Sequence, residues 1–141
     1  MAEQKTIQEN ALEFVSLLTP GNFDKAKEWI AKECAYRYMD QDLKGDAIIQ
    51  SFSENHQGAK EKFESIEYLD GFVNSTEGNT VFVGVRDKIT AGSDVHIYED
   101  CLAVTVNEKR GPGSIQGIKH CPIPEERDQL KAFMKKIGLS Q

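Results

Sequence analysis

Hydrophobic residues change their spacing along the chain near Phe63. Before this residue they recur every three or four positions, which is typical of amphipathic helices, and after it they alternate with polar residues, which is typical of strands. Thr6 and Glu9 match a capping box at the start of the first helix. Predicted helices cover residues 6–18, 22–34, 46–58 and 124–137, and predicted strands cover residues 35–39, 63–73, 80–90, 94–106 and 114–122, with a polar turn at 40–45.

The segment from Asp94 to Val106 is predicted to be the central strand, because it is long and contains neither Gly nor Pro. One of its faces carries His96, Tyr98 and Asp100 before it becomes aliphatic at Leu102. A cavity with an apolar floor and a few polar groups produces this gradient, and so does a strand whose first half runs out into solvent.

Gly- and Asn-rich segments at 74–79, 91–93 and 107–113 join the strands, which predicts an antiparallel meander. The chain shows no internal repeat, linker or low-complexity segment. The sequence therefore predicts an α+β fold in a single domain, residues 1–141, with N-terminal helices packed in a curved antiparallel sheet and a covering C-terminal helix.

The net charge of −6 argues against a nucleic-acid backbone or an anionic membrane as the main partner. No apolar run approaches the ~20 residues that span a bilayer, and the N-terminus lacks the apolar core of a signal peptide. Cys34, Cys101 and Cys121 show no CxxC pairing, which favours buried free thiols in a reducing compartment. We therefore expect a cytoplasmic protein that binds neither nucleic acid nor membranes.

Two segments carry a resemblance to a known superfamily. Residues 14–24 contain a tight turn between two helices, and residues 35–48 follow the order strand, acid, loop, Gly and helix. With the meander that follows, the chain resembles the nuclear transport factor two-like superfamily over residues 7–122, and most of all its polyketide-cyclase-like and ketosteroid-isomerase-like members. The resemblance implies a cone-shaped domain, in which a strongly curved sheet wraps the helices around a deep apolar pocket, and dimers formed through the outer face of the sheet.

The resemblance places Asp40 where ketosteroid isomerases hold their proton-shuttling acid. Their oxyanion-hole tyrosine corresponds to Phe14, which has no hydroxyl, and their oxyanion-hole aspartic acid corresponds to a position near Leu102, with Asp100 one pleat away. Ketosteroid isomerase activity is therefore not expected. Scytalone-dehydratase-like members use Tyr, His and Asp around a water, and the residues here that could supply such a set are Tyr36 or Tyr38, His96, Tyr98, Asp100 and His120.

These residues also have structural explanations. Asp40 at the rim of an apolar cavity could relay protons between carbon and oxygen atoms, but it could equally cap the third helix or form a turn. The polar half of the central strand could be solvated. His120 could be a partly buried structural histidine, and the helix dipole alone explains His56.

The sequence thus predicts one pocket. Its candidate catalytic residues are Asp40, His96, Asp100 and His120, and its candidate substrate-binding residues are Phe14, Tyr38, Phe52, Tyr98, Leu102 and Ile118. Neither an HExxH motif nor another ligand spacing indicates a metal site, and no cofactor is expected.

Three functions follow from such a fold. They are an isomerase- or lyase-type enzyme that uses acid–base chemistry without a metal, a non-catalytic binder of an apolar metabolite, and a dimerisation or protein-interaction module. The volume of the cavity separates the third from the other two. A homodimer is predicted in each case, because the face with Val95, Ile97, Cys101 and Ala103 needs a cover.

Overall fold

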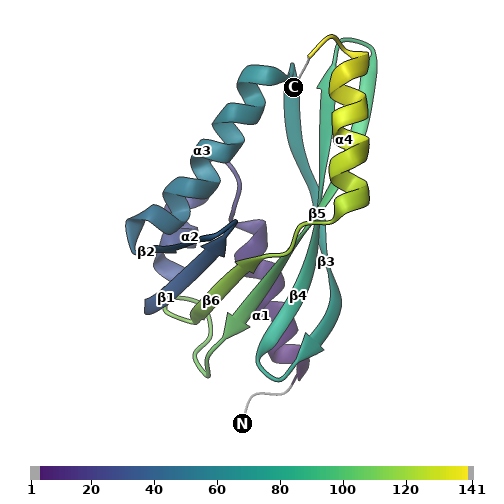
Figure 1. Cartoon of the computed structure of the whole chain (residues 1–141). Coiled ribbons are helices and arrows are strands. Elements are labelled where there is room, and N and C mark those ends of the chain that lie inside the picture. Colours follow the sequence, from purple (N-terminus) through teal and green to yellow (C-terminus); the bar gives the residue numbers. More distant parts are fainter. Residues whose placement is uncertain (1–3, 140–141) are drawn as a thin grey trace.

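The structure, a computed structural model, describes residues 4–139. Helices come first, the long strands follow, and a last helix ends the described chain, in the predicted order (Figure 1). The elements are α1 (Gln4–Ser16), α2 (Phe23–Trp29), β1 (Ile30–Tyr38), β2 (Gln41–Lys44), α3 (Asp46–Lys62), β3 (Ser65–Glu77), β4 (Thr80–Ala91), β5 (Asp94–Val106), β6 (Ile115–His120) and α4 (Pro124–Lys136).

Within residues 4–139, six strands form a mixed sheet in the order β2-β1-β6-β5-β4-β3. β5 lies inside the sheet, as predicted, because it pairs with β4 along its length and with β6 from Leu102 to Val106. The predicted antiparallel sheet needs one correction: β1 runs parallel to β6, while the other pairs are antiparallel. The physical reason is the long connection between β1 and β6, which contains α3 and the β3–β5 hairpins and can therefore reverse direction before β6.

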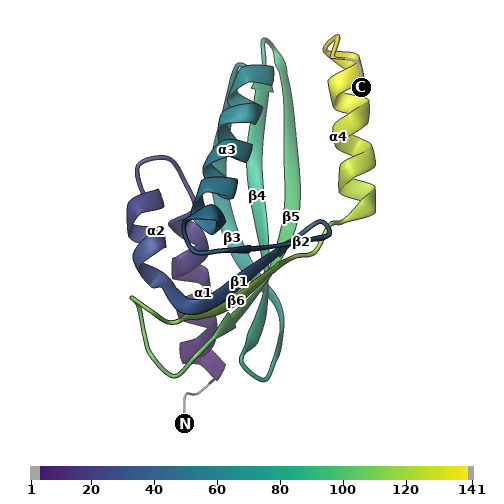
Figure 2. The same cartoon turned by 60° about the vertical axis from the view of Figure 1, so that its left-hand side comes forward.

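The main core lies between α1 and the lower half of the sheet. Val81 and Val83 of β4 and Val104 of β5 alternate toward this side and are fully buried with Phe14 of α1. β3, β4 and β5 extend upward beyond β6, and α3 and α4 flank this upper part (Figures 1 and 2). The upper part of the sheet and these two helices therefore enclose a second region of the molecule, above the main core.

α4 covers a strand edge that would otherwise be open. β6 ends at His120, so the upper half of β5 pairs only with β4. Glu126 Oε1 of α4 accepts a hydrogen bond from the backbone N–H of Glu99 on this edge, at 2.8 Å. Lys136 Nζ forms a 3.1 Å ion pair with Asp94. α4 thus occupies an edge at which a foreign strand could otherwise pair.

The apolar side of α4 forms a small second core. Phe133 and Met134 are buried there with Phe63 and Ile89. These buried contacts are typical of a helix that stabilises the fold, and a helix that served only as a lid over the cavity would not need them. α4 therefore supports the upper sheet in addition to bounding the space beside it.

Several predicted element ends are wrong at the N-terminal side. Thr6 does not cap α1, because α1 already includes Gln4. The Thr6 hydroxyl instead accepts a hydrogen bond from the Arg110 guanidinium, at 2.8 Å. Cys34 belongs to β1 and not to the second helix, because α2 ends at Trp29.

The turn predicted at residues 40–45 contains a strand. β2 pairs with β1 there, from Gln41 opposite Tyr38 to Lys44 opposite Ala35. α3 also continues past Gly58 to Lys62, since this glycine does not adopt the positive φ that ends a helix. Both differences lengthen the elements that border the upper region.

The outer face of β5 is less exposed than predicted. Val95 and Ile97 are 53% and 43% exposed, but Cys101 and Ala103 are only 8% and 6% exposed. Part of this cover comes from within the sheet, because the Phe72 ring lies over Gly84, the partner of Cys101 on β4. The open apolar area is thus confined to the upper half of the strand, and the homodimer stays a prediction.

Candidate functional site

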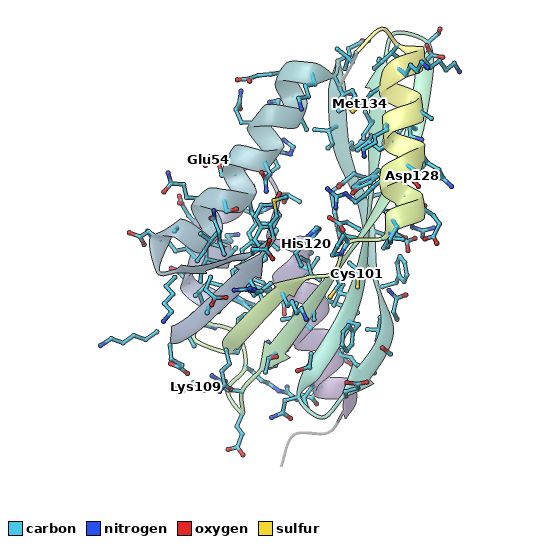
Figure 3. All side chains as sticks on the ribbon, in the orientation of Figure 1. Glu54, Cys101, Lys109, His120, Asp128 and Met134 are labelled. Atoms are coloured by element: carbon cyan, nitrogen blue, oxygen red, sulfur yellow. The ribbon has the colours of Figure 1, made fainter. Side chains whose placement is uncertain are left out.

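A cavity of about 1110 Å³ lies between the upper sheet, α3 and α4. Its apolar wall comes from all three layers, with Phe52 on α3, Val85, Ile89 and Leu102 on the sheet, and Met134 on α4. Figure 3 shows the side chains that project into this region from the two helices and the strands. Cavities that hold drug-sized ligands measure about 300–1,000 Å³, so this space can hold a molecule of several rings.

His120 and Asp100 form a hydrogen-bonded pair on the wall of the cavity. His120 Nε2 lies 2.8 Å from Asp100 Oδ2 and 3.0 Å from Oδ1. The pairing of β5 with β6 causes this contact, since His120 stands opposite Leu102 and therefore diagonally across from Asp100. Only 15% of the His120 side chain and 28% of the Asp100 side chain are exposed.

This pair can perform acid–base chemistry. An ionised carboxylate only accepts hydrogen bonds, so Nε2 of His120 carries the hydrogen and donates a hydrogen bond to Asp100. In the neutral ring, Nδ1 then holds a free lone pair, and no residue in the described part of the chain hydrogen-bonds to it. Asp100 Oδ1 also accepts the backbone N–H of Cys101, at 2.9 Å, which fixes the carboxylate. The imidazole is therefore oriented, with one nitrogen available to a ligand.

Aromatic rings line the side of the cavity next to His120. Tyr36 stacks on Phe52 with a centroid distance of 4.6 Å and on Tyr38 with a distance of 5.5 Å. Tyr38 meets the His120 ring edge-on at 5.4 Å. Burial, and then the neighbouring Tyr38 and Asp100, raise the pKa of Tyr36, so its hydroxyl stays protonated. A planar apolar ligand would find both stacking surfaces and hydrogen-bond donors here.

Tyr98 brings a third phenol to the same group of residues. Burial, followed by the charge of Asp100, raises the pKa of Tyr98 to about 12. The Tyr98 hydroxyl is therefore a hydrogen-bond donor at any physiological pH. After burial, the charge of Asp100 also raises the pKa of Tyr36, Tyr98 and Asp87, so the Asp100 carboxylate acts on all three groups.

Asp87 is a cavity residue that the sequence analysis missed. It stands on β4 opposite Tyr98 and lines the cavity. Burial, and then the charge of Asp100, raise the pKa of Asp87 from 3.8 to about 6. The alternation of Val83, Val85 and Ile89 places position 87 on the inward face, and this signal could have identified it.

The raised pKa of Asp87 predicts a specific pH dependence of stability. Its folded-state pKa lies above the unfolded value, so its contribution is fully present below pH 3.8 and is lost as the pH rises through about 6. Asp87→Asn, which cannot ionise, should raise the free energy of unfolding by about 1–3 kcal/mol at pH 7 and by much less at pH 4.5. Urea titrations at both pH values measure this difference.

The control for this prediction is Glu61→Gln, which neutralises an exposed acid on α3. Its effect should be small and similar at both pH values. A destabilising Asp87→Asn at pH 7 would mean that the ionised carboxylate makes favourable contacts.

Seven of the ten predicted site residues line the cavity. They are Tyr38, Asp40, Phe52, Tyr98, Asp100, Leu102 and His120.

Phe14 and Ile118 lie elsewhere, and their predicted place on the cavity wall is corrected here. Both are buried in the main core, where Phe14 has no exposed surface and stacks on Trp29 at 6.5 Å. Phe14 packs within the main core, whereas the next residue of α1, Val15, lines the cavity.

His96 is also absent from the cavity wall. Its ring stacks on Phe133 at 5.1 Å beneath α4, and its Nε2 atom is buried without a hydrogen-bond partner in the described chain. α4 packs over this part of β5, so Phe133 lies against His96 where the sequence predicted a ligand.

Asp40 lies at the rim, in the turn between β1 and β2, and is exposed. It does not cap α3, since the residue at the start of that helix is Gly45, without a side-chain capping bond. The neighbouring Asp42 forms an ion pair with Arg37 at 3.2 Å.

No group of three or more His, Cys, Asp or Glu residues within the described part of the chain is arranged to hold a metal ion. None of the described helices has the length and apolar character that crossing a bilayer requires.

No protein-family model matches this sequence, and no curated protein is significantly similar to it. Solved structures do share its architecture. A candidate SnoaL-like polyketide cyclase from Shewanella denitrificans OS-217 superposes with a TM-score of 0.59 at 12% identity, over 89% of this chain and 97% of that one. PrhC from Penicillium brasilianum NBRC 6234 gives 0.63 at 8% identity, over 94% and 90%.

A third structure, an NTF2-like protein of unknown function from Exiguobacterium sp. 255-15, gives a TM-score of 0.50 at 15% identity, over 84% of this chain and 98% of that one. One fold of this kind hosts many activities, so these similarities concern architecture. This protein has the nuclear transport factor two-like (NTF2-like) fold, as its sequence predicted.

Proposed function

We propose that this protein binds an apolar small molecule in the cavity and that His120, oriented by Asp100, moves a proton on that molecule. The reaction would be of the isomerase or lyase type and would need no metal. The observation that carries this proposal is the hydrogen-bonded His120–Asp100 pair on the wall of a cavity of about 1110 Å³. The structures of the SnoaL-like polyketide cyclase and of PrhC support it only through their common fold.

The surroundings of the pair favour proton transfer. A base works best when its free nitrogen can reach a C–H or O–H bond within hydrogen-bonding distance, and Nδ1 of His120 has no competing protein partner in the described chain. Because both side chains of the pair are largely buried, water screens them little, which strengthens the electrostatic effect of Asp100 on the imidazolium that forms. Asp100 would thereby stabilise the product of proton abstraction.

The same part of the cavity offers donors for a developing oxyanion. The Tyr98 hydroxyl is protonated at neutral pH, and Asp87 is protonated below about pH 6. Either group could donate to a carbonyl oxygen while His120 takes a proton from the neighbouring carbon. This arrangement suits an enolisation or a dehydration next to a carbonyl.

Asp40 remains the second candidate for the base. The resemblance to ketosteroid isomerases makes it the expected acid, but its exposure at the rim places it in water. A base at the rim would act on the end of a ligand that protrudes from the cavity. Asp40→Asn should therefore change the rate of proton transfer by less than about threefold, far less than the loss of the His120 imidazole.

Ligand binding can be tested without knowledge of the natural substrate. N-phenyl-1-naphthylamine, a neutral apolar dye, should fluoresce when it enters the cavity. Ala59, a half-buried α3 residue on the cavity wall, can be enlarged to fill the space. Ala59→Trp should weaken dye binding at least about tenfold, because an indole occupies most of the room that an aromatic ring needs.

The matched control is Ala132→Trp, which adds the same indole to an exposed position of α4 away from the cavity. It should leave the affinity for the dye within about twofold of the original protein. No dye binding by the original protein, or equal binding by both variants, would contradict a ligand cavity and favour the interaction-module function.

A further inference from the structure

Two cysteines face each other across β5 and the end of β6, next to the His120–Asp100 pair in the chain. Because Leu102 stands opposite His120, the next position of the same ladder sets Cys101 opposite Cys121. The backbone N–H of Cys121 donates to the Cys101 carbonyl at 2.9 Å, and the Cys121 thiol donates to the Lys119 carbonyl at 3.7 Å. Burial, and then the neighbouring Cys121, raise the pKa of the Cys101 thiol. Figure 3 shows Cys101 close to His120, where the chain leaves the sheet for α4.

We propose that Cys101 and Cys121 form a reversible intramolecular disulfide, so that this pair is a site of oxidative modification. Opposite residues of a hydrogen-bonded antiparallel pair have Cα atoms about 5.5 Å apart. Disulfides usually join Cα atoms that are about 4.4–6.8 Å apart, so the backbone needs no large movement. Because the two residues stand opposite each other in the antiparallel ladder, their side chains leave the same side of the sheet.

The local ladder leaves room for the small twist that the bond requires. The Cys101 N–H donates to the Asp100 carboxylate and not to the Cys121 carbonyl. The pair is therefore joined by one backbone hydrogen bond in place of two, and Cys121 lies just outside β6. A strand end held in this way can rotate more easily than the middle of a sheet.

The chemistry balances with a small disulfide such as oxidised glutathione as the oxidant. The half-buried Cys121, as a thiolate, attacks one sulfur of this disulfide and releases one reduced thiol. Cys101 then loses its proton to water and attacks the Cys121 sulfur, which releases the second thiol and forms the Cys101–Cys121 bond. Burial raises the pKa of Cys101 to about 11, so the exposed partner reacts first and Cys101 resolves the mixed disulfide.

The third cysteine provides an internal comparison. Cys34 is 1% exposed, and burial raises the pKa of its thiol to about 11. Its Sγ atom donates a weak hydrogen bond to the backbone carbonyl of Ala35, at 3.9 Å, within the main core. Cys34 should therefore neither react with the oxidant nor pair with another cysteine.

The bond would act on the neighbouring site. Cys101 follows Asp100 in the chain, and Cys121 follows His120, so the disulfide would fix the distance between the two strands that carry this pair. It would also tether the segment that leads into α4. The disulfide does not depend on the proposed function, because its formation needs only the two thiols and the ladder.

The experiment oxidises the folded, reduced protein with excess oxidised glutathione and then alkylates the free thiols in denaturant. Mass spectrometry of the intact chain and of its peptides should show one alkylated cysteine, Cys34, and a Cys101–Cys121 crosslink that dithiothreitol removes. The melting temperature of the oxidised protein should rise by roughly 5–10 °C, since the bond closes a loop of about twenty residues.

The variants separate this result from other thiol reactions. Cys34→Ser should crosslink as the original protein does, and Cys121→Ser, at a half-exposed position, should fold normally but form no crosslink and show no rise in melting temperature. Three alkylated cysteines after oxidation, a lasting glutathione adduct on Cys121, or a disulfide-linked dimer through Cys121 would each overturn the proposal.

Discussion

His120→Gln should lower the elimination rate of a benzisoxazole in the cavity by a factor of about 10²–10⁴. A benzisoxazole is a small apolar bicycle whose N–O bond breaks when a base removes its ring C–H proton, so it reports proton transfer directly. Gln can still hydrogen-bond to Asp100, 2.8 Å away in the original protein, but it cannot take up a proton. The absorbance of the phenolate product at a fixed pH measures the rate.

The structure offers close controls for this result. His56 also lines the cavity, from α3, so His56→Gln makes the same chemical change a short distance away. Its effect should stay below about threefold, as should that of Asp40→Asn at the rim. A loss of rate in Asp40→Asn with an unchanged rate in His120→Gln would move the base from His120 to Asp40.

Phe14→Ala should lower the free energy of unfolding by about 3–5 kcal/mol. Phe14 has no exposed surface, so removal of its ring leaves an empty cavity in the main core of the variant. Because the free energy of unfolding of a domain is only about 5–15 kcal/mol, this loss is a large part of the total stability. Urea titrations followed by tryptophan fluorescence measure it, since Trp29 stacks on Phe14.

The matched change is Phe52→Ala, which removes the same ring from the cavity wall. Phe52 is only partly buried, so its loss should cost less stability and should change the affinity for the naphthylamine dye. If Phe14→Ala left stability intact and altered dye binding instead, Phe14 would belong to the cavity after all.

The spacing of hydrophobic residues was sufficient to predict the main elements of the fold, but not the short strand β2 or the pairing of β1 with β6. The change from helical to alternating spacing near Phe63 predicted the order of the long elements, and the length of the segment from Asp94 to Val106 predicted the interior strand. β2 escaped prediction because its four residues, three of them polar, gain strand structure only from pairing with β1. The parallel β1–β6 pair escaped prediction because no local pattern records which distant strands meet.

The site was predictable in composition but not in pairing. Asp100 and His120 were both named, yet only the register of β5 with β6 reveals that they touch. Asp87 shares the inward face of β4 with apolar residues, and its raised pKa depends on burial that the sequence does not specify. The alternation of side chains along β5 places His96 on the same face as Tyr98 and Asp100, so the sequence assigned it to the cavity. In the structure, α4 covers that position.

Competition between the dye and the elimination reaction tests the central claim most directly. If His120 transfers protons inside the cavity, N-phenyl-1-naphthylamine should inhibit benzisoxazole elimination competitively, with an inhibition constant equal to its dissociation constant from fluorescence. Ala59→Trp should weaken both constants together, and Ala132→Trp should change neither. Elimination that continues at its full rate when the dye saturates the protein would show that the cavity and the base are separate, and would contradict the account.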